Sequence, residues 1–171
     1  GAVGVEVPNK KSAMVTMRSI LESKEWRAAT DPLSFAIGKD IGGNAVIGEL
    51  NSMPHVLIAG QTGSGKSVMI NSLISSLLFR NSPAELKLIL VDPKQVELAP
   101  YNGVPHLLTP VIVEPEKTLS ALKWAVNEME RRYSLLAEFG HRQIKSYNND
   151  KKIEEKMPYF VIVIDELADL M

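Results

Sequence analysis

The sequence predicts an α/β fold in which a mainly parallel sheet is flanked by helices. Residues 86–91 are an apolar run of strand length, and residues 159–164 are a continuous run of β-branched and aromatic residues. Such runs are typical of strands that are buried on both faces, as in parallel sheets. Apolar residues at helical spacing follow residue 66 and again residue 115, so strands and helices alternate along the chain. This alternation favours a parallel α/β sheet, preceded here by a small N-terminal helix and a β-hairpin.

The N-terminal elements are predicted from capping and turn signals. Residues 1–32 are a lead-in segment, extended up to residue 11, in which Ser12 caps a short helix. The apolar side of this helix consists of Met14, Val15, Met17, Ile20 and Leu21. Residues 33–38 and 45–50 then predict two short strands, joined as a hairpin around a pair of glycines.

A glycine-rich motif follows another strand-like run, residues 55–59. It matches the phosphate-binding pattern G-x-x-x-x-G-K-[ST] at every fixed position. Its residues are Gly60, Gln61, Thr62, Gly63, Ser64, Gly65, Lys66 and Ser67, with Val68 next in the helix. Glycines let the backbone approach a phosphate closely, and the N–H groups at the helix start bind it. Lys66 is predicted to reach the β- and γ-phosphates and Ser67 to hold Mg²⁺, whereas a glycine-rich turn without a ligand is the alternative.

The chain between the two later strands is predicted as a loop, a long helix and a second loop. Residues 93–115 contain several prolines and predict a structured loop with one short turn. A helix follows, and Gly140 stands where its C-terminal cap belongs. Its apolar residues are Leu119, Leu122, Val126, Met129, Tyr133 and Leu136, which favours a helix lying on a sheet over a coiled coil. The polar stretch 143–156 predicts a mobile surface loop.

The strand 159–164 delivers Asp165 and Glu166 at its carboxyl end. In open α/β sheets, ligands bind outside the carboxyl ends of the strands. The phosphate loop leaves its own strand at the corresponding end, so we expect both motifs to face one crevice. Asp165 is predicted to hold Mg²⁺, directly or through water, and Glu166 to deprotonate the attacking water. Acidic pairs occur at the ends of many strands, so this pair indicates a catalytic site only in combination with the phosphate loop upstream.

Other polar residues have weaker claims to a functional role. Asp92 also ends a strand. It could support the metal ligands from the second coordination shell, or it could only stabilise the turn that follows the strand, and both roles are open. Arg131 and Arg132 are predicted to form a solvated helix face, with contact to a neighbouring subunit's phosphate as the alternative. The three histidines lack metal-ligand spacing and are predicted to be structural; they are His55, His106 and His141.

The composition excludes several classes of protein. The 171 residues suffice for one domain with a sizeable core, and the absence of cysteine excludes disulfides and thiolate metal sites. No apolar run approaches the roughly 18 residues of a membrane span, and the first residues lack the features of a signal peptide. A formal net charge of −1 gives no global basic signal for nucleic acid, so DNA affinity would come from local loops or from an assembly.

Taken together, these stretches resemble the motor domain of the FtsK/SpoIIIE family of bacterial DNA translocases. The phosphate loop is shared by many families, whereas Asp92-Pro93-Lys94 and the segment 127–133 are far more particular. The matching pieces run in family order over nearly the whole chain, and they are residues 4–9, 37–41, 53–68, 91–94, 97–98, 101, 103, 105–108, 127–133, 147–148 and 164–171.

The resemblance implies a RecA-like P-loop NTPase fold, with residues 33–171 as the N-terminal part of an ATPase motor domain. It implies ATP and Mg²⁺ as ligands and an ATPase that translocates double-stranded DNA in chromosome segregation during cell division or sporulation. It further implies a ring hexamer at the division septum, on the cytoplasmic side of the bacterial inner membrane. Membrane contact would come only through an N-terminal region of a parent protein, so the stretch of sequence shown is expected to be soluble.

The resemblance also predicts a specific strand order. In ATPases of this branch, a sensor strand lies between the phosphate-loop strand and the acidic strand, and it follows the acidic strand in sequence. That strand, the trans-acting arginine and the main DNA-contacting loops would come after Met171. We therefore expect residues 56–59 and 161–164 to lie about two strand spacings apart, roughly 9–10 Å, and not to be direct neighbours.

Rival functions differ in the motifs that they require. A transporter ATPase of the ABC type would carry Leu-Ser-Gly-Gly-Gln where this chain has residues 154–158, and a GTPase would have Asp-x-x-Gly where Asp92 is followed by Pro-Lys-Gln. A conjugation or secretion coupling ATPase of the same superfamily is the closest enzyme alternative. A non-hydrolysing ATP-binding assembly scaffold is the alternative from another class, and it would have no need of Glu166.

Overall fold

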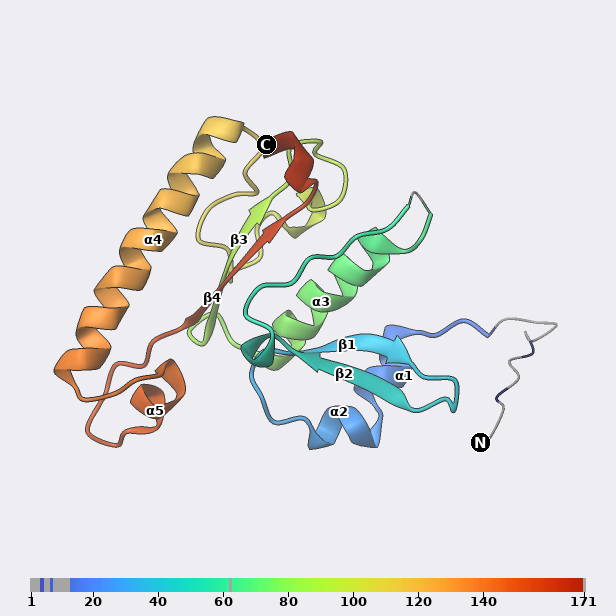
Figure 1. Cartoon of the computed structure of the whole chain (residues 1–171), viewed down its shortest axis with the longest axis horizontal. Helices are drawn as coiled ribbons and strands as arrows, with labels where there is room; N and C mark the ends of the chain where they lie inside the picture. The colour runs from blue at the N-terminus through green and yellow to red at the C-terminus, as the bar shows by residue number, and fades with distance from the viewer. Residues whose placement is uncertain (1–3, 5–6, 8–12, 62, 171) are drawn as a thin grey trace. The chain divides into compact units, whose positions relative to one another are not determined.

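The structure, a computed structural model, describes residues 4, 7, 13–61 and 63–170 (Figure 1). The chain divides into two units, Gly1–Leu77 and Leu78–Met171.

Two short helices, α1 (Met17–Leu21) and α2 (Lys24–Ala28), precede the hairpin of the first unit. Each helix is capped by a side-chain hydroxyl that accepts a backbone N–H: the Thr16 hydroxyl accepts from Ser19 in α1, and the Ser23 hydroxyl accepts from Trp26 in α2. The prediction of a single helix that includes Met14 and Val15 is wrong, because both of these residues precede the first cap. The predicted cap, Ser12, lies outside the described residues, as does most of the extended lead-in.

The predicted hairpin is confirmed: β1 (Ser34–Lys39) pairs antiparallel with β2 (Ala45–Glu49). Its turn is closed by Asp40, whose Oδ1 accepts the Asn44 N–H at 2.8 Å. Gly43 has a φ of +83°, which only glycine adopts at little cost. A short 3-10 turn, Leu50–Ser52, follows β2.

Helix α3 (Lys66–Arg80) is joined to β1 through two serine side chains. The Ser76 hydroxyl accepts the Ala36 N–H at 2.9 Å, and the Ser72 hydroxyl donates to the Ala36 carbonyl at 2.8 Å. Both backbone groups of Ala36 are thereby satisfied where the strand register shifts between Ala36 and Gly38. The helix that follows the phosphate loop is thus fixed to the hairpin by buried hydrogen bonds.

The predicted strand at residues 55–59 is wrong for this structure. These residues have no regular secondary structure, and Val56 and Leu57 are 43% and 78% exposed. A strand exists only through hydrogen bonds to a neighbour, and β1 and β2 are the strands of the described part of this unit. An apolar run of strand length is therefore insufficient here. The predicted spacing between residues 56–59 and 161–164 stays a prediction.

The second unit is built on two parallel strands, β3 (Leu86–Val91) and β4 (Tyr159–Ile164), which confirms both predicted strands. They pair without a shift, from Leu86 opposite Tyr159 to Val91 opposite Ile164. On its other edge β3 forms parallel bridges from Leu88 to Leu107 and from Val91 to Ile112. With neighbours on both sides β3 is almost wholly buried, whereas β4 is half-buried along its length.

The loop between β3 and the next helix contains one short 3-10 turn, Ala99–Tyr101, as predicted. Helix α4 (Pro115–Glu138) then lies on the sheet, where Ala121 packs against a core of Ile89, Val91 and Ile112. The Trp124 ring lies 5.4 Å from that of Phe160 on β4, so the prediction of a helix packed on a sheet is confirmed.

The packed face of α4 is only partly the predicted apolar stripe. Leu136 is buried and Leu122 half-buried. The other four predicted members are exposed, and these are Leu119, Val126, Met129 and Tyr133. Thr118 is buried instead, and Ala121 and Trp124 contact the sheet.

The C-terminus of α4 has the cap that the sequence predicts. Gly140 has a φ of +72°, its N–H donates to Ala137, and the His141 N–H donates to Leu136. These two bonds define a Schellman motif.

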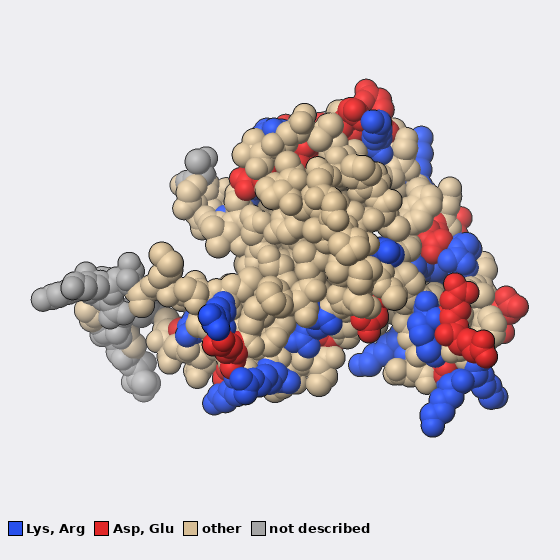
Figure 2. Space-filling view, turned by 180° about the vertical axis from the view of Figure 1, so that it is seen from behind, with Lys and Arg blue, Asp and Glu red and all other residues tan. Residues whose placement is uncertain are grey.

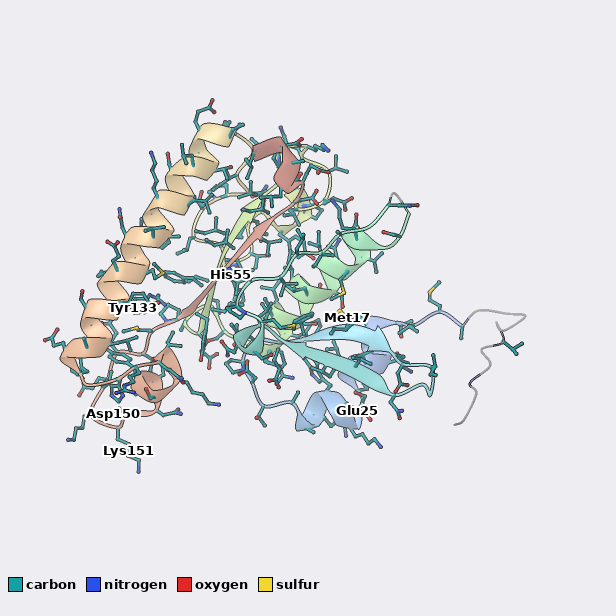
Figure 3. The ribbon with its side chains drawn as sticks, in the orientation of Figure 1. Met17, Glu25, His55, Tyr133, Asp150 and Lys151 are labelled. Atoms are coloured by element: carbon teal, nitrogen blue, oxygen red, sulfur yellow. The ribbon has the colours of Figure 1, made fainter. Side chains whose placement is uncertain are left out.

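The prediction of a mobile loop at residues 143–156 is wrong. Helix α5 (Ile144–Asn149) lies within it, and Tyr147 and Ile153 are buried with Leu136 and Met157. The side-chain amide of Asn148 bonds both backbone groups of Met157 at 2.8 Å. Widely spaced apolar residues thus anchor a segment whose charged residues, such as Asp150 and Lys151, lie at its surface (Figure 3).

Candidate nucleotide site and acidic strand end

The phosphate loop has a backbone that requires its glycines. Gly63 and Gly65 have φ values of +81° and +98°, a conformation that side chains disfavour. A Cβ at Gly60 would collide with the Ser64 side chain. The Ser64 N–H donates to the Gln61 carbonyl at 2.9 Å, which closes a turn inside the loop. These features explain why the pattern has glycine at its fixed positions.

The helix α3 begins within the motif, at Lys66. Lys66 and Ser67 are half-buried, and Val68 is 73% exposed. The first N–H groups of such a helix have no carbonyl partner in the helix and favour an anion. Of the predicted ligand residues, Thr62 lies outside the described residues.

Asp165 directly follows β4 and is 4% exposed. Its N–H donates to the Val91 carbonyl at 2.9 Å, which extends the parallel ladder by one residue. Glu166 comes next, is half-buried, and has a φ of +59°. The acidic pair therefore stands at the carboxyl end of β4, as predicted. That this edge and the phosphate loop face one crevice stays a prediction.

Asp92 ends β3 at the same edge and is completely buried. Its Oδ2 accepts the N–H groups of Glu97 and Leu98, each at 2.9 Å, and so holds the turn that follows the strand. Its Oδ1 is also buried and has no hydrogen-bond partner among the described residues. Of the two roles left open for Asp92, the turn role is present, and one buried oxygen remains for another partner.

Lys94 is the residue of this edge that sequence reasoning missed. Its Nζ lies 3.3 Å from Oε2 of Glu166 and 3.8 Å from Oδ2 of Asp169. Two adjacent parallel strands deliver the residues that follow them to one edge. The position of Lys94 shortly after the end of β3 was therefore the signal in the sequence that could have predicted its presence at this edge.

The histidines are structural where the structure gives them partners. His106 is buried with its Nε2 at 2.8 Å from the Asn81 carbonyl, and His141 Nε2 lies 3.1 Å from Oδ2 of Asp150. His55 is exposed, in the segment that leads to the phosphate loop (Figure 3). No three His, Asp or Glu side chains gather into a metal-binding group among the described residues.

Arg131 and Arg132 have different environments, although both bond Glu128. Arg131 is 61% exposed and fits the predicted solvated face. Arg132 is 15% exposed and donates to the Pro158 carbonyl at 2.7 Å, so the prediction of a solvated position is wrong for it. The hydrogen bonds from Arg131, and then those from Arg132, lower the pKa of Glu128 to about 2 against the cost of its burial.

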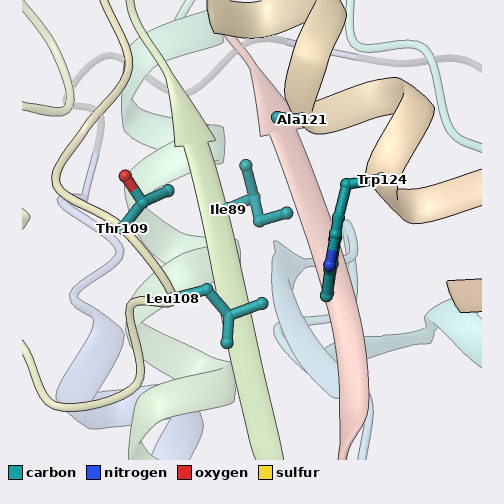
Figure 4. Close-up of a pocket in the computed structure, with 5 residues that line it drawn as sticks. All are labelled: Ile89, Leu108, Thr109, Ala121 and Trp124. Atoms are coloured by element: carbon teal, nitrogen blue, oxygen red, sulfur yellow. The ribbon is translucent and has the colours of Figure 1, made fainter.

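A cavity of about 310 Å³ lies between β3, the loop after Leu107 and α4 (Figure 4). It is lined by Ile89, Leu108, Thr109, Ala121 and Trp124. Its lining holds a single hydroxyl and no charge, so it does not suit a phosphate. The cavity is distinct from every predicted site residue.

Charged side chains of both signs intermingle on the face drawn in Figure 2, where the described residues form no large patch of one sign. This distribution agrees with the net charge of −1. None of the described helices combines the length and apolar character that crossing a bilayer requires.

Solved structures share the fold. The pCW3 conjugation coupling protein TcpA, in a monomer form with ATPgS, is similar with a TM-score of 0.69 and 32% identity, over 87% of this chain and 40% of that chain. The cytoplasmic domain of the Type VII secretion ATPase EccC of Thermomonospora curvata is similar with a TM-score of 0.70 and 27% identity, over 93% of this chain and 21% of that chain. The fold is that of a RecA-like α/β P-loop NTPase.

Curated relatives are more similar in sequence. A DNA translocase FtsK of Caldanaerobacter subterraneus subsp. tengcongensis is 57% identical over 99% of this chain and 24% of its own length. The DNA translocase SftA of Bacillus subtilis is 52% identical over 99% of this chain and 18% of its own length. The chain thus spans a quarter or less of these relatives. The FtsK/SpoIIIE family matches residues 16–171, and the chain belongs to this family.

Proposed function

We propose that this chain is part of an ATP-driven motor that translocates double-stranded DNA in chromosome segregation, during cell division or sporulation. The observation that carries the proposal is identity of 52–57% over 99% of the chain to proteins named DNA translocases. The coupling and secretion proteins reach only 27–32%.

Each motif has a defined part in the proposed hydrolysis. The N–H groups from Gly63 to Ser67 bind phosphate oxygens, and Lys66 neutralises charge on the β- and γ-phosphates. Glu166 accepts a proton from the attacking water. As it does so, the water oxygen bonds to the γ-phosphorus, and the bond between the γ-phosphorus and the oxygen that bridges to the β-phosphate breaks. ADP and phosphate are the products.

The donor set fits Mg²⁺. The proposed ligands, the Ser67 hydroxyl and the Asp165 carboxylate, are the hard oxygen donors that this ion prefers. The buried, unpartnered Oδ1 of Asp92 offers a further acceptor at the end of β3 for an ion-bound water. When bound, Mg²⁺ would neutralise phosphate charge.

The assembly and location are proposed from the family. We place the motor in a ring hexamer on duplex DNA, at the division septum on the cytoplasmic side of the inner membrane. Membrane contact would lie in an N-terminal region of a parent protein, outside the 24% of the FtsK relative that this chain spans. Because the net charge is −1, the DNA contacts of this chain would be local and sensitive to salt.

A conjugation or secretion coupling ATPase is the second candidate, and TM-scores of 0.69 and 0.70 to proteins so described favour keeping it. The strandedness of the DNA that stimulates hydrolysis separates the two. A non-hydrolysing ATP-binding scaffold is the third candidate, and detection of ATP turnover would exclude it.

The test is ATP turnover by the complete natural protein, without DNA, with single-stranded DNA and with duplex DNA. We expect duplex DNA to stimulate most. The Glu166→Gln variant should bind ATP normally and hydrolyse it at least about a hundredfold more slowly, since general-base help is typically worth 10²–10⁴. Glu154→Gln, at an exposed position, is the matched control. Parental turnover by Glu166→Gln would remove Glu166 as the base, and equal stimulation by single strands would favour the coupling ATPase.

A further inference from the structure

A lysine contacts the proposed general base. Lys94 Nζ lies 3.3 Å from Oε2 of Glu166 and donates to it. The same ammonium lies 3.8 Å from Oδ2 of Asp169. Lys94 therefore bridges Glu166, which precedes the short 3-10 turn Leu167–Leu170, and Asp169 within that turn.

The backbone on both sides of this contact is strained. Among the described non-glycine residues, positive φ is found at Gln95, with +56°, and at Glu166, with +59°. One of them adjoins Lys94, and the other is its partner. Such residues cost free energy and persist only where neighbouring contacts hold them, and they cluster at functional sites.

Within the described part of the chain, two contacts hold Glu166 in place. Its carbonyl accepts the Asp169 N–H at 3.1 Å, which fixes the backbone of the turn. Its carboxylate has the ammonium of Lys94 as a side-chain partner. The Glu166 carboxylate direction therefore depends on Lys94, which in turn is set by the register of β3 against β4.

This ion pair adds little to stability. The side chains of Lys94, Glu166 and Asp169 are 54%, 34% and 39% exposed, and ion pairs between such solvent-accessible side chains contribute little to the free energy of unfolding. Its effect on orientation is larger, because a catalytic group misplaced by about 1 Å costs as much as a hundredfold in rate.

We propose that Lys94 is a positioning residue that orients the carboxylate of Glu166 for proton transfer. This inference rests on the proposed function, in which Glu166 is the base. Lys94 acts through Glu166 and requires no contact with ATP, so its loss should lower kcat and leave the KM for ATP unchanged.

The experiment compares variants of the complete natural protein by ATP turnover with duplex DNA. Lys94→Met keeps the length of the side chain and removes its charge, and we expect kcat to fall about tenfold with KM within about twofold. Lys94→Arg keeps a cation and should restore most of the activity. Lys151→Met, in an exposed loop, is the matched control and should equal the parent.

The Glu166→Gln background separates this inference from the proposed function. There, Lys94→Met should cause no further loss, because both changes act on one group. A parental kcat for Lys94→Met overturns the inference, and so does a loss that Lys94→Arg fails to restore or that adds to Glu166→Gln. If Glu166→Gln alone kept the parental rate, the base assignment itself would be wrong. An unchanged melting temperature of Lys94→Met confirms that the fold is intact.

Discussion

The guanidinium carbon of Arg132 lies 3.9 Å from the ring centroid of Phe160. The same side chain donates to Glu128 within α4 and to the carbonyl of Pro158, just before β4. A single arginine therefore ties the long helix to the strand that carries the acidic pair, through one cation–π contact to Phe160 and one charged hydrogen bond to Pro158, while Glu128 holds its guanidinium within the helix.

Replacing Arg132 by Ala should lower the free energy of unfolding by about 2–3 kcal/mol, since hydrogen bonds of charged groups contribute about 1.5–3 kcal/mol. Arg131→Ala is the matched control, because Arg131 also bonds Glu128 but is 61% exposed, and it should cost under about 1 kcal/mol. Urea unfolding followed by tryptophan fluorescence measures both. Equal losses in the two variants would contradict the anchoring role of Arg132.

Glu128 predicts a loss of stability in acid. Hydrogen bonds from Arg131 and Arg132 lower its pKa from 4.5 to about 2. A lowered folded-state pKa contributes stability above pH 4.5, which is lost as the pH falls toward 2. Glu128→Gln should therefore be less stable than the parent by about 2 kcal/mol at neutral pH. This difference should shrink between pH 4.5 and 2, and a difference independent of pH in urea titrations would disprove the ionic contribution.

Gly140→Ala should destabilise the protein by about 1–2 kcal/mol, because its φ of +72° places a Cβ in a disfavoured conformation. The open space around Gly140 means that no collision adds to this cost. Gly38→Ala is the control, since Gly38 also has open space but lacks a positive φ. Thermal unfolding should separate the two, and equal midpoints would show that the capping conformation carries no cost.

Lys66→Ala should abolish stabilisation by ATP. A ligand at a hundred times its Kd adds about 2.7 kcal/mol to the free energy of unfolding, which appears as a raised melting temperature. Lys123→Ala, on the exposed side of α4, should keep this response. A parental shift in Lys66→Ala would exclude Lys66 from the nucleotide site.

The elements that were predicted correctly are those whose structure is determined by residues within the element itself. The hairpin has its turn residues, α4 has its proline start and glycine cap, and β3 and β4 are mostly apolar. The errors concern segments whose state depends on partners distant in sequence. Residues 55–59 have no neighbouring strand among the described residues of their unit, and residues 143–156 are ordered by burial against Leu136.

The candidate site, like the fold, was predicted where short motifs determine it and missed where it depends on contacts between residues distant in sequence. Motifs located the phosphate loop and placed Asp165 and Glu166 at a strand end, and the structure agrees on that position. The contact of Lys94 with Glu166 joins residues 72 positions apart. It depends on the pairing of β3 with β4, which no local pattern encodes.

The unshifted ladder between β3 and β4 has an evolutionary consequence. Six consecutive residue pairs fix where Asp92 and Asp165 emerge, so the connection between the strands can lengthen or shorten without moving either carboxylate. A one-residue insertion inside either strand would instead reverse the faces of all residues beyond it and separate the two acids. Natural variation in length should therefore accumulate at the surface turns around α5, while both strands keep a constant number of residues.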